Sequence, residues 1–320
     1  MQRRDFMAMS GAAAMALVAM PARASTGQIS VVATTGMIAD TAARIGGDLV
    51  KIRGLMGPGV DPHGYRQTRT DIVAITKADL VLWHGLYLEA QMEDFFHKLG
   101  KRGNVVAVAE GLPRDKLLSH PDYDDKFDPH VWMVPTLWAD VIPVIRDALS
   151  ATLPDHAETF AANAESFRTE VLAMGDYAAA ATATIPTESR VLVTAHDAFS
   201  YFGAAYGFEV MGIQGISTES EAGLNRIGTL VNTLVERRIG AVFVESSVSD
   251  RNIRALIEGA AAQGHTVSIG GELFSDAMGT PGTYEGSYLG MIDHNVTTIT
   301  RALGGEAPAQ GVSGKLSAGL

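Results

Sequence analysis

The sequence predicts an α/β protein with two lobes, each a mainly parallel sheet flanked by helices, joined by one long backbone helix. Three observations lead to this prediction. Apolar, β-branched runs alternate with helical patterns from residue 25, the alternation pauses near residue 152 and restarts near residue 190, and an uninterrupted helical pattern separates the two series. Alternating strands and helices are typical of parallel sheets that are covered by helices.

Residues 1–24 are expected to be a signal peptide that is not part of the fold. A basic start at Arg3 and Arg4 precedes an apolar run over 11–20 and a small-x-small ending at 22–24. This pattern is typical of secretion signals, and the apolar run is too short to span a bilayer. The paired arginines resemble a twin-arginine signal; an ordinary secretion signal with a chance arginine pair is the alternative.

The composition limits the class of protein. The chain has no cysteine, which excludes disulfides, thiolate metal sites and the lipid-modified cysteine that tethers many exported proteins. A net charge of −11 without basic clusters argues against nucleic acid or anionic lipid as a partner. We therefore expect a soluble protein, free in a bacterial periplasm and without a lipid anchor.

The first lobe is predicted to cover residues 25–152 and to begin with a strand. Its expected strands are 30–35 and the runs LVKIRGLM, ADLVLWHG and NVVAVAE, and its expected helices are 38–45, 68–77 and 88–99. Each strand is β-branched and apolar, as buried parallel strands are. The order predicts a sheet with helices packed on it.

The connecting helix is predicted over residues 153–186, between two prolines. Its apolar residues step by four and three, which places them on one face: Phe160, Ala164, Phe167, Val171, Met174 and Ala178. At 1.5 Å per residue such a helix is long enough to run along both lobes. An ordinary helix packed within one lobe is the alternative.

The second lobe is predicted to cover residues 187–320. Its expected strands are RVLVTAH, FEVMGIQ, GAVFVESS and HTVSIGG, and its expected helices are 223–238, 252–263 and 284–303. The same order of elements as in the first lobe predicts a second parallel sheet with helices on its faces.

One tripeptide occurs twice in the first lobe, as Asp61-Pro62-His63 and as Asp128-Pro129-His130. Proline fixes its own φ and favours an extended residue before it, so each histidine is positioned by a stiff turn. The recurrence has a plain alternative, because Asp-Pro is also common turn chemistry.

Polar residues follow strands in both lobes. His63 and His130 come after strand-like runs of the first lobe, while His196 and Asp276 follow strands of the second. Ligands of open α/β sheets bind at the carboxyl ends of the strands, so these side chains are expected to converge between the lobes. Three imidazoles and a carboxylate suit divalent first-row metals. Spacing alone does not establish the site, since its members come from distant loops.

Five segments together resemble a known family. GVDPHGY, DPHVWM, VTAHDAFSYFGAAYGFEVMGIQGISTESEA, VFVESSVSDRNI and GGELFSDAMG are similar, in the same order, to segments of the TroA-like solute-binding proteins of manganese and zinc ABC transporters. The resemblance covers nearly the whole chain after the signal peptide.

The resemblance implies a bilobed periplasmic receptor that carries one divalent ion, Zn²⁺ or Mn²⁺, to an ABC-type membrane permease. By the same resemblance the ligands are His63, His130, His196 and Asp276, and the protein is not an enzyme. We expect a monomer. Some manganese-binding members look to have glutamate in place of His196. Zinc-specialised members carry a histidine-rich loop before the second Asp-Pro-His, where this chain has only His120.

Several further residues have two interpretations. His84 is either a neighbour that supports the site or a buried histidine at a strand end, and Glu245 either orients a ligand imidazole or interacts with a helix N-terminus. Trp132 is expected to pack beside the site. The remaining histidines are expected to have surface or core roles: His97, His156, His265 and His294.

Two other functions fit part of the pattern. A zinc-dependent hydrolytic enzyme also uses histidines and a carboxylate, but leaves one metal position open for water and needs a general base. Glu245 is the candidate base if Asp276 is not a ligand. A binding protein for a chelated metal is the second alternative, although such a cleft calls for aromatic walls or arginines, which these motifs do not offer.

Overall fold

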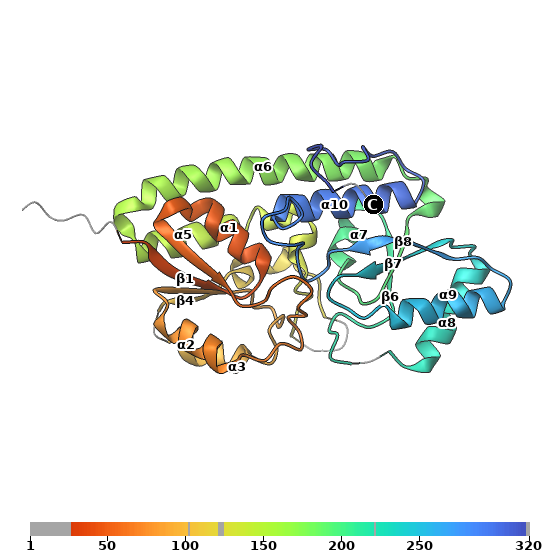
Figure 1. The fold of residues 1–320 in the computed structure, drawn as a ribbon, viewed down its shortest axis with the longest axis horizontal. Coiled ribbons are helices and arrows are strands. Elements are labelled where there is room, and N and C mark those ends of the chain that lie inside the picture. Colours follow the sequence, from red (N-terminus) through yellow and green to blue (C-terminus); the bar gives the residue numbers. More distant parts are fainter. Residues whose placement is uncertain (1–26, 102, 121–124, 221, 318–320) are drawn as a thin grey trace, which may run out of the picture.

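A computed structural model describes residues 27–101, 103–120, 125–220 and 222–317 of the chain. It consists of two α/β lobes side by side beneath one long helix (Figure 1). The predicted signal peptide lies outside the described residues. Within the described ranges, no helix combines the length and the apolar composition needed to cross a membrane.

The first lobe contains a four-stranded sheet in the order β2-β1-β3-β4, with every neighbouring pair parallel. Its strands are β1 (Ile29–Ala33), β2 (Val50–Gly54), β3 (Leu80–Trp83) and β4 (Val105–Ala107). Its helices are α1 (Gly36–Gly46), α2 (Arg69–Lys77), α3 (Glu93–Gly100), α4 (Pro135–Trp138) and α5 (Ile142–Thr152). The predicted parallel sheet is confirmed.

The second lobe contains two parallel strand pairs, β5-β6 and β7-β8, with β5 beside β7. The strands are β5 (Val191–Thr194), β6 (Glu209–Gly212), β7 (Ala241–Glu245) and β8 (Ser268–Leu273). The helices are α7 (Ser200–Tyr206), α8 (Leu224–Glu236), α9 (Arg251–Ala262) and α10 (Tyr288–Ala302).

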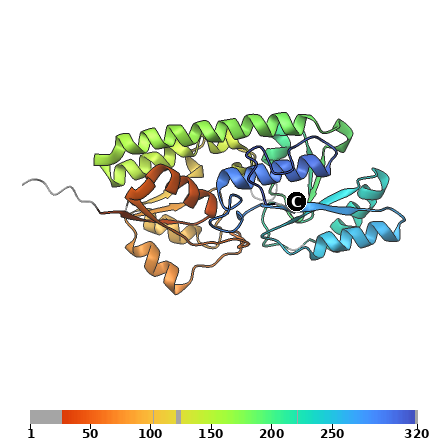
Figure 2. The ribbon, with the colours of Figure 1, turned by 45° about the horizontal axis from the view of Figure 1, so that its top comes forward.

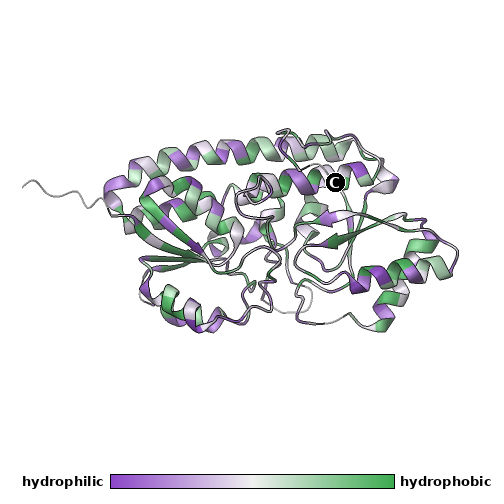
Figure 3. Cartoon of the chain, in the orientation of Figure 1, coloured by the Kyte–Doolittle hydropathy of each residue, from purple (hydrophilic) through white to green (hydrophobic). Residues whose placement is uncertain are grey.

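Helix α6 (Ala157–Ala183) runs along the top of both lobes, as the two views of the ribbon agree (Figures 1 and 2). All six residues predicted for its apolar face are buried. Figure 3 shows hydrophilic and hydrophobic residues alternating along it, as expected for a helix with one exposed face. The backbone-helix prediction is confirmed, while the division of the chain near residues 152 and 187 stays a prediction.

One apolar cluster connects the lobes through this helix. It contains Val31 of β1, Phe167 of α6 and Phe243 of β7, together with Ile292 of α10. The helix therefore shares a continuous core with the elements on both sides.

Helix α3 starts later than predicted, at Glu93 instead of near residue 88. Gly85, Leu86 and Tyr87 have φ of 82°, 51° and 69°, which is left-handed backbone that a right-handed helix cannot contain. Glu89 accepts hydrogen bonds from the backbone N–H groups of His84 (2.7 Å) and Gly85 (3.1 Å). Its buried carboxylate holds this turn in place.

Three helices, the single turn α4 and the longer α5 and α7, were not predicted. The apolar run around Ile142 and Ile145 contains Pro143, which argues against a helix interior but is tolerated in the first turn of a helix, where it lies in α5. Helix α7 is short, rich in aromatic residues and ends at Gly207 with φ of 74°. Helices α5 and α7 both depend on burial against neighbouring elements that the local sequence does not reveal.

Candidate metal centre

The two Asp-Pro-His turns have the same local geometry. Asp61 Oδ1 accepts the backbone N–H of His63 at 2.8 Å, and Asp128 Oδ1 accepts that of His130 at 2.9 Å. An aspartate that binds the backbone two residues on forms a side-chain turn. The aspartate therefore fixes the backbone conformation of the histidine in each turn, and both copies of the tripeptide have this role.

His196 follows β5 and is held by the end of the neighbouring strand. Glu245, the last residue of β7, accepts the backbone N–H of His196 at 2.8 Å. Gly212 at the end of β6 lies so close to this turn that a Cβ there would be 2.6 Å from the backbone nitrogen of Asp197. Only glycine allows the two segments to approach this closely.

Asp276 follows β8 on a segment that the first lobe contacts directly. The indole N–H of Trp132 donates to the backbone oxygen of Ser275 at 2.8 Å. The indole also lies edge-on to the ring of His130, with ring centres 5.1 Å apart. Trp132 therefore packs beside the site, as predicted, and fixes the position of Asp276 relative to His130.

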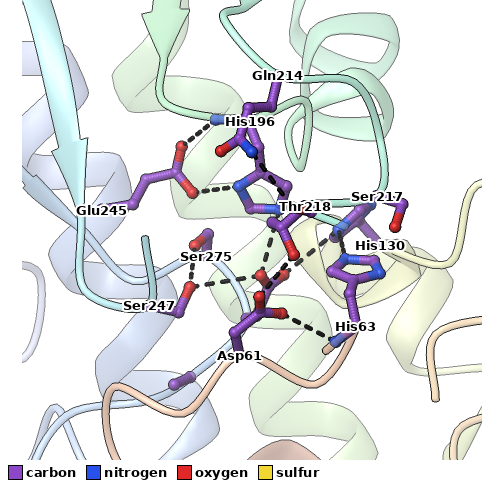
Figure 4. Close-up of polar contacts among 12 residues, drawn as sticks. Asp61, His63, His130, His196, Gln214, Ser217, Thr218, Glu245, Ser247 and Ser275 are labelled. Atoms are coloured by element: carbon purple, nitrogen blue, oxygen red, sulfur yellow. Dashed lines mark hydrogen bonds and ion pairs between the residues drawn. The ribbon is translucent and has the colours of Figure 1, made fainter. Parts of the chain in front are cut away.

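These turns bring His63, His130, His196 and Asp276 together. Figure 4 shows the three histidines of this group. One ligand atom from each lies within 4.8 Å of all the others. The Nε2 atoms of His63 and His130 are 3.4 Å apart, and the Asp276 carboxylate lies 3.3 Å from His130 Nε2 and 3.2 Å from His196 Nε2. No member of the group is more than 2% exposed.

The charges of this group are strongly coupled. Burial lowers the pKa of His63 to about 3, and the neighbouring imidazoles of His130 and His196 add to this effect. Burial also opposes ionisation of Asp276, yet the imidazoles around it hold its pKa well below the usual value. Asp276 is therefore a carboxylate, and His63 a neutral imidazole, at neutral pH.

The other two imidazoles are each paired with a buried carboxylate. Asp128 Oδ1 lies 2.7 Å from His130 Nδ1, and Glu245 Oε2 lies 2.5 Å from His196 Nδ1. Burial alone lowers an imidazole pKa, but Asp128 outweighs it and raises the pKa of His130 to about 9. Glu245 and Asp276 likewise raise the pKa of His196 well above its usual value.

The donor set fits a divalent transition metal. With Nδ1 bound to a carboxylate, His130 and His196 present Nε2 to the centre of the group. Among the described residues, His196 Nε2 and Asp276 Oδ1 are buried and make no hydrogen bond, although ion-pair contacts of 3.2 and 3.3 Å join the carboxylate to His196 and His130. Buried polar atoms normally have hydrogen-bond partners, so this arrangement favours a ligand among these side chains. Three nitrogens and one oxygen suit Zn²⁺ or Mn²⁺.

Both open interpretations are now decided by contacts. Glu245 orients the imidazole of His196 and does not belong to a helix N-terminus, because α9 begins only at Arg251. His84 is not within the group: its Nε2–H donates to the backbone oxygen of Pro129 at 2.7 Å, and burial lowers its pKa to about 3. His84 is thus a buried neutral histidine that supports the turn before His130.

The roles of Asp128, Glu89 and Thr218 are not apparent from the sequence. Asp128 belongs to the second Asp-Pro-His motif, but the sequence does not show that its carboxylate contacts the side chain of His130. Glu89 is fully buried and accepts a hydrogen bond from Thr34 Oγ1 at 2.6 Å. Thr218 donates to Asp61 across the lobes. No local pattern marks either residue.

The histidines expected to have surface or core roles are not members of the group of four. His265 Nε2 binds the backbone oxygen of Ile239 at 2.7 Å, and His294 Nε2 binds that of Glu272 at 2.8 Å. His97 is exposed near Glu93. These contacts are structural, in agreement with the prediction.

Comparisons with known proteins support the resemblance. The family model for the zinc-uptake complex component A, periplasmic, matches residues 31–302. The manganese-binding lipoprotein MntA of Bacillus subtilis is 50% identical over 277 residues, covering 86% of this chain and 90% of the relative. The zinc-binding protein TroA of Treponema pallidum is 44% identical over 280 residues, covering 88% and 90%.

The structural comparison agrees with the sequence comparison. The solved structure of the periplasmic zinc-binding protein TroA from Treponema pallidum superposes with a TM-score of 0.84 at 44% identity, and the match covers 87% of this chain and 99% of that one. Sequence, fold and the grouping of the four side chains thus lead to the same conclusion: the chain belongs to the family of periplasmic zinc-uptake complex component A proteins.

Proposed function

We propose that the chain is a periplasmic solute-binding protein, which captures one Zn²⁺ or Mn²⁺ between its lobes and delivers it to an ABC-type permease. His63, His130, His196 and Asp276 are the proposed ligands. The observation that carries this proposal is the group of four buried ligand atoms within 4.8 Å of one another. Relatives named as manganese-binding and zinc-binding proteins support the choice of metals.

Binding without catalysis is favoured by the way the group is closed. A hydrolytic site needs a position for water and a free general base. Glu245, the candidate base, has one carboxylate oxygen on the backbone and the other on Nδ1 of His196. Both of its oxygens thus serve to orient His196, which is the role of a supporting residue and not of a general base.

A chelated metal is a weaker candidate than a bare ion. The four side chains are at most 2% exposed, so an organic ligand could not contact all of them in this conformation. A bare or partly hydrated ion needs only the space between the four ligand atoms.

We also propose that the protein is exported and remains free in the periplasm. The Bacillus subtilis relative is by name a lipoprotein. This chain has no cysteine to carry such a lipid.

Equilibrium dialysis with Zn²⁺ and with Mn²⁺, followed by elemental analysis, tests the function. We expect one ion per chain. Replacement of His63 and His130 together by alanine should abolish binding, while the matched replacement of His97 and His156, which lie outside the site, should not. Binding that survives the first pair of changes would disprove the ligand assignment.

A further inference from the structure

One segment of the second lobe crosses to the first lobe next to the site. Residues 214–220 follow β6, and Thr218 Oγ1 donates a hydrogen bond to Asp61 Oδ2 at 2.5 Å, between residues 157 positions apart in the chain. Figure 4 shows Thr218 and Asp61 facing each other, beside His63. This contact joins the two lobes within the metal centre.

Further hydrogen bonds connect each of these two residues, or the segment that carries it, to the turn of a proposed ligand. On one side, Asp61 uses its other oxygen to hold the backbone N–H of His63. On the other side, the N–H of Gln214 donates to Ala195 O at 3.0 Å and the N–H of Asp197 donates to Gly215 O at 3.2 Å. Ala195 and Asp197 flank His196, so the segment connects the turn of His63 to the turn of His196.

The segment also covers the site. Ile216 is 4% exposed, and with Ser217 it lines a small void against His63 and Pro129. The side-chain amide of Gln214 donates to the backbone oxygens of Thr218 (3.2 Å) and Ser220 (3.1 Å). These internal bonds give the segment a defined conformation.

The second cross-lobe contact of this segment is weaker. Gln91 donates to Glu219 at an exposed position, where water competes for both groups. The bond from Thr218 to Asp61 is partly buried and has a carboxylate acceptor, which makes it the stronger of the two. Because the ligands are buried, the ion cannot leave until some covering segment moves.

We propose that the hydrogen bond from Thr218 to Asp61 is a latch that holds residues 214–220 over the site and sets the rate at which the metal leaves. Thr218 is a positioning residue in this scheme, since it acts on the ligands through Asp61 and through the segment. The expected effect on the rate of metal release rests on the proposed function. Whether the hydrogen bond holds residues 214–220 over the site can be tested without metal.

The kinetic test uses purified wild-type, Thr218→Val and Thr218→Ser proteins loaded with Zn²⁺ and mixed with excess chelator. Valine keeps the shape of threonine and removes the donor, whereas serine keeps the hydroxyl. We expect Thr218→Val to release the ion about tenfold faster, the effect of losing one hydrogen bond to a charged group. Thr218→Ser should behave like wild type, as should Thr229→Val, a change at an exposed position of α8.

The structural test is hydrogen–deuterium exchange of residues 214–220 in the metal-free proteins. Faster exchange in Thr218→Val than in Thr218→Ser is expected, and Thr218→Ala replaces the valine variant if that one does not fold. Equal exchange and equal release rates in the valine and serine variants would overturn the latch. A wild-type protein that binds no metal would instead overturn the proposed function. In that case the exchange rates of the valine and serine variants would still show whether the hydrogen bond holds the segment in place.

Discussion

Glu245 binds His196 twice, with one carboxylate oxygen on its backbone N–H at 2.8 Å and the other on Nδ1 at 2.5 Å. The imidazole can therefore neither rotate nor exchange its tautomer without breaking a buried hydrogen bond. Asp128 holds His130 in a similar way, but uses a single oxygen for both contacts. The two lobes thus fix one imidazole each by the same device.

Glu245→Gln should weaken metal binding by about 10- to 100-fold, the usual effect of losing a partner that orients a ligand. An amide that turns its NH₂ toward Nδ1 favours a proton on Nε2, which blocks the lone pair needed by the metal. Competition with a metal-sensitive dye measures the change. Glu272→Gln, at an exposed position of β8, is the matched control. Equal affinity in the two variants would mean that Glu245 has no part in binding.

Metal binding at pH 7 should release about two protons per ion. The pKa of His130 is raised to about 9 and that of His196 well above its usual value, so both imidazoles are protonated at pH 7 in the metal-free protein and must lose their protons to the metal. Affinity should then fall as the pH falls from about 9, well above the ordinary imidazole pKa of about 6.5. Titration calorimetry in buffers of different ionisation enthalpy counts the protons. A count of zero would show that the imidazoles are already neutral.

Zn²⁺ should raise the melting temperature of the protein. An ion that binds only the folded chain stabilises it by about 2.7 kcal/mol at a free concentration 100 times its dissociation constant. Calorimetric scans with increasing free Zn²⁺ should show a midpoint that rises continuously by several degrees. The His63→Ala, His130→Ala double variant provides the control, since its midpoint should not respond to the metal.

His196→Glu should lower the ratio of Zn²⁺ to Mn²⁺ affinity. Imidazole nitrogen favours zinc, whereas carboxylate oxygen suits the harder manganese ion. Zinc should still bind more tightly, because the general order of affinities places it above manganese at nearly any such site. Competition calorimetry on metal-free protein measures the ratio. If a folded variant keeps the wild-type ratio, His196 does not touch the metal.

Most of the strands and helices were predictable from the sequence because they depend on local signals, and the four central side chains were marked by their places after strands and by the family resemblance. The alternation of strands and helices is visible in the apolar pattern, and His63 and His130 are marked by a stiff turn. The left-handed turn at Leu86 and Tyr87 was not predictable, because it depends on the buried carboxylate of Glu89. The contact of Thr218 with Asp61 was equally hidden, since it joins residues that only the packing of the two lobes brings together.

The long helix α6 has a consequence for how the protein folds. Its buried face belongs to one apolar cluster that also contains residues of β1, β7 and α10. A lobe produced alone would expose the part of that cluster that it normally shares, and large exposed apolar surfaces promote aggregation. We therefore expect the two lobes to unfold as one cooperative unit. The metal-free chain should unfold in a single transition, and neither 25–152 nor 187–320 should fold when expressed without the rest.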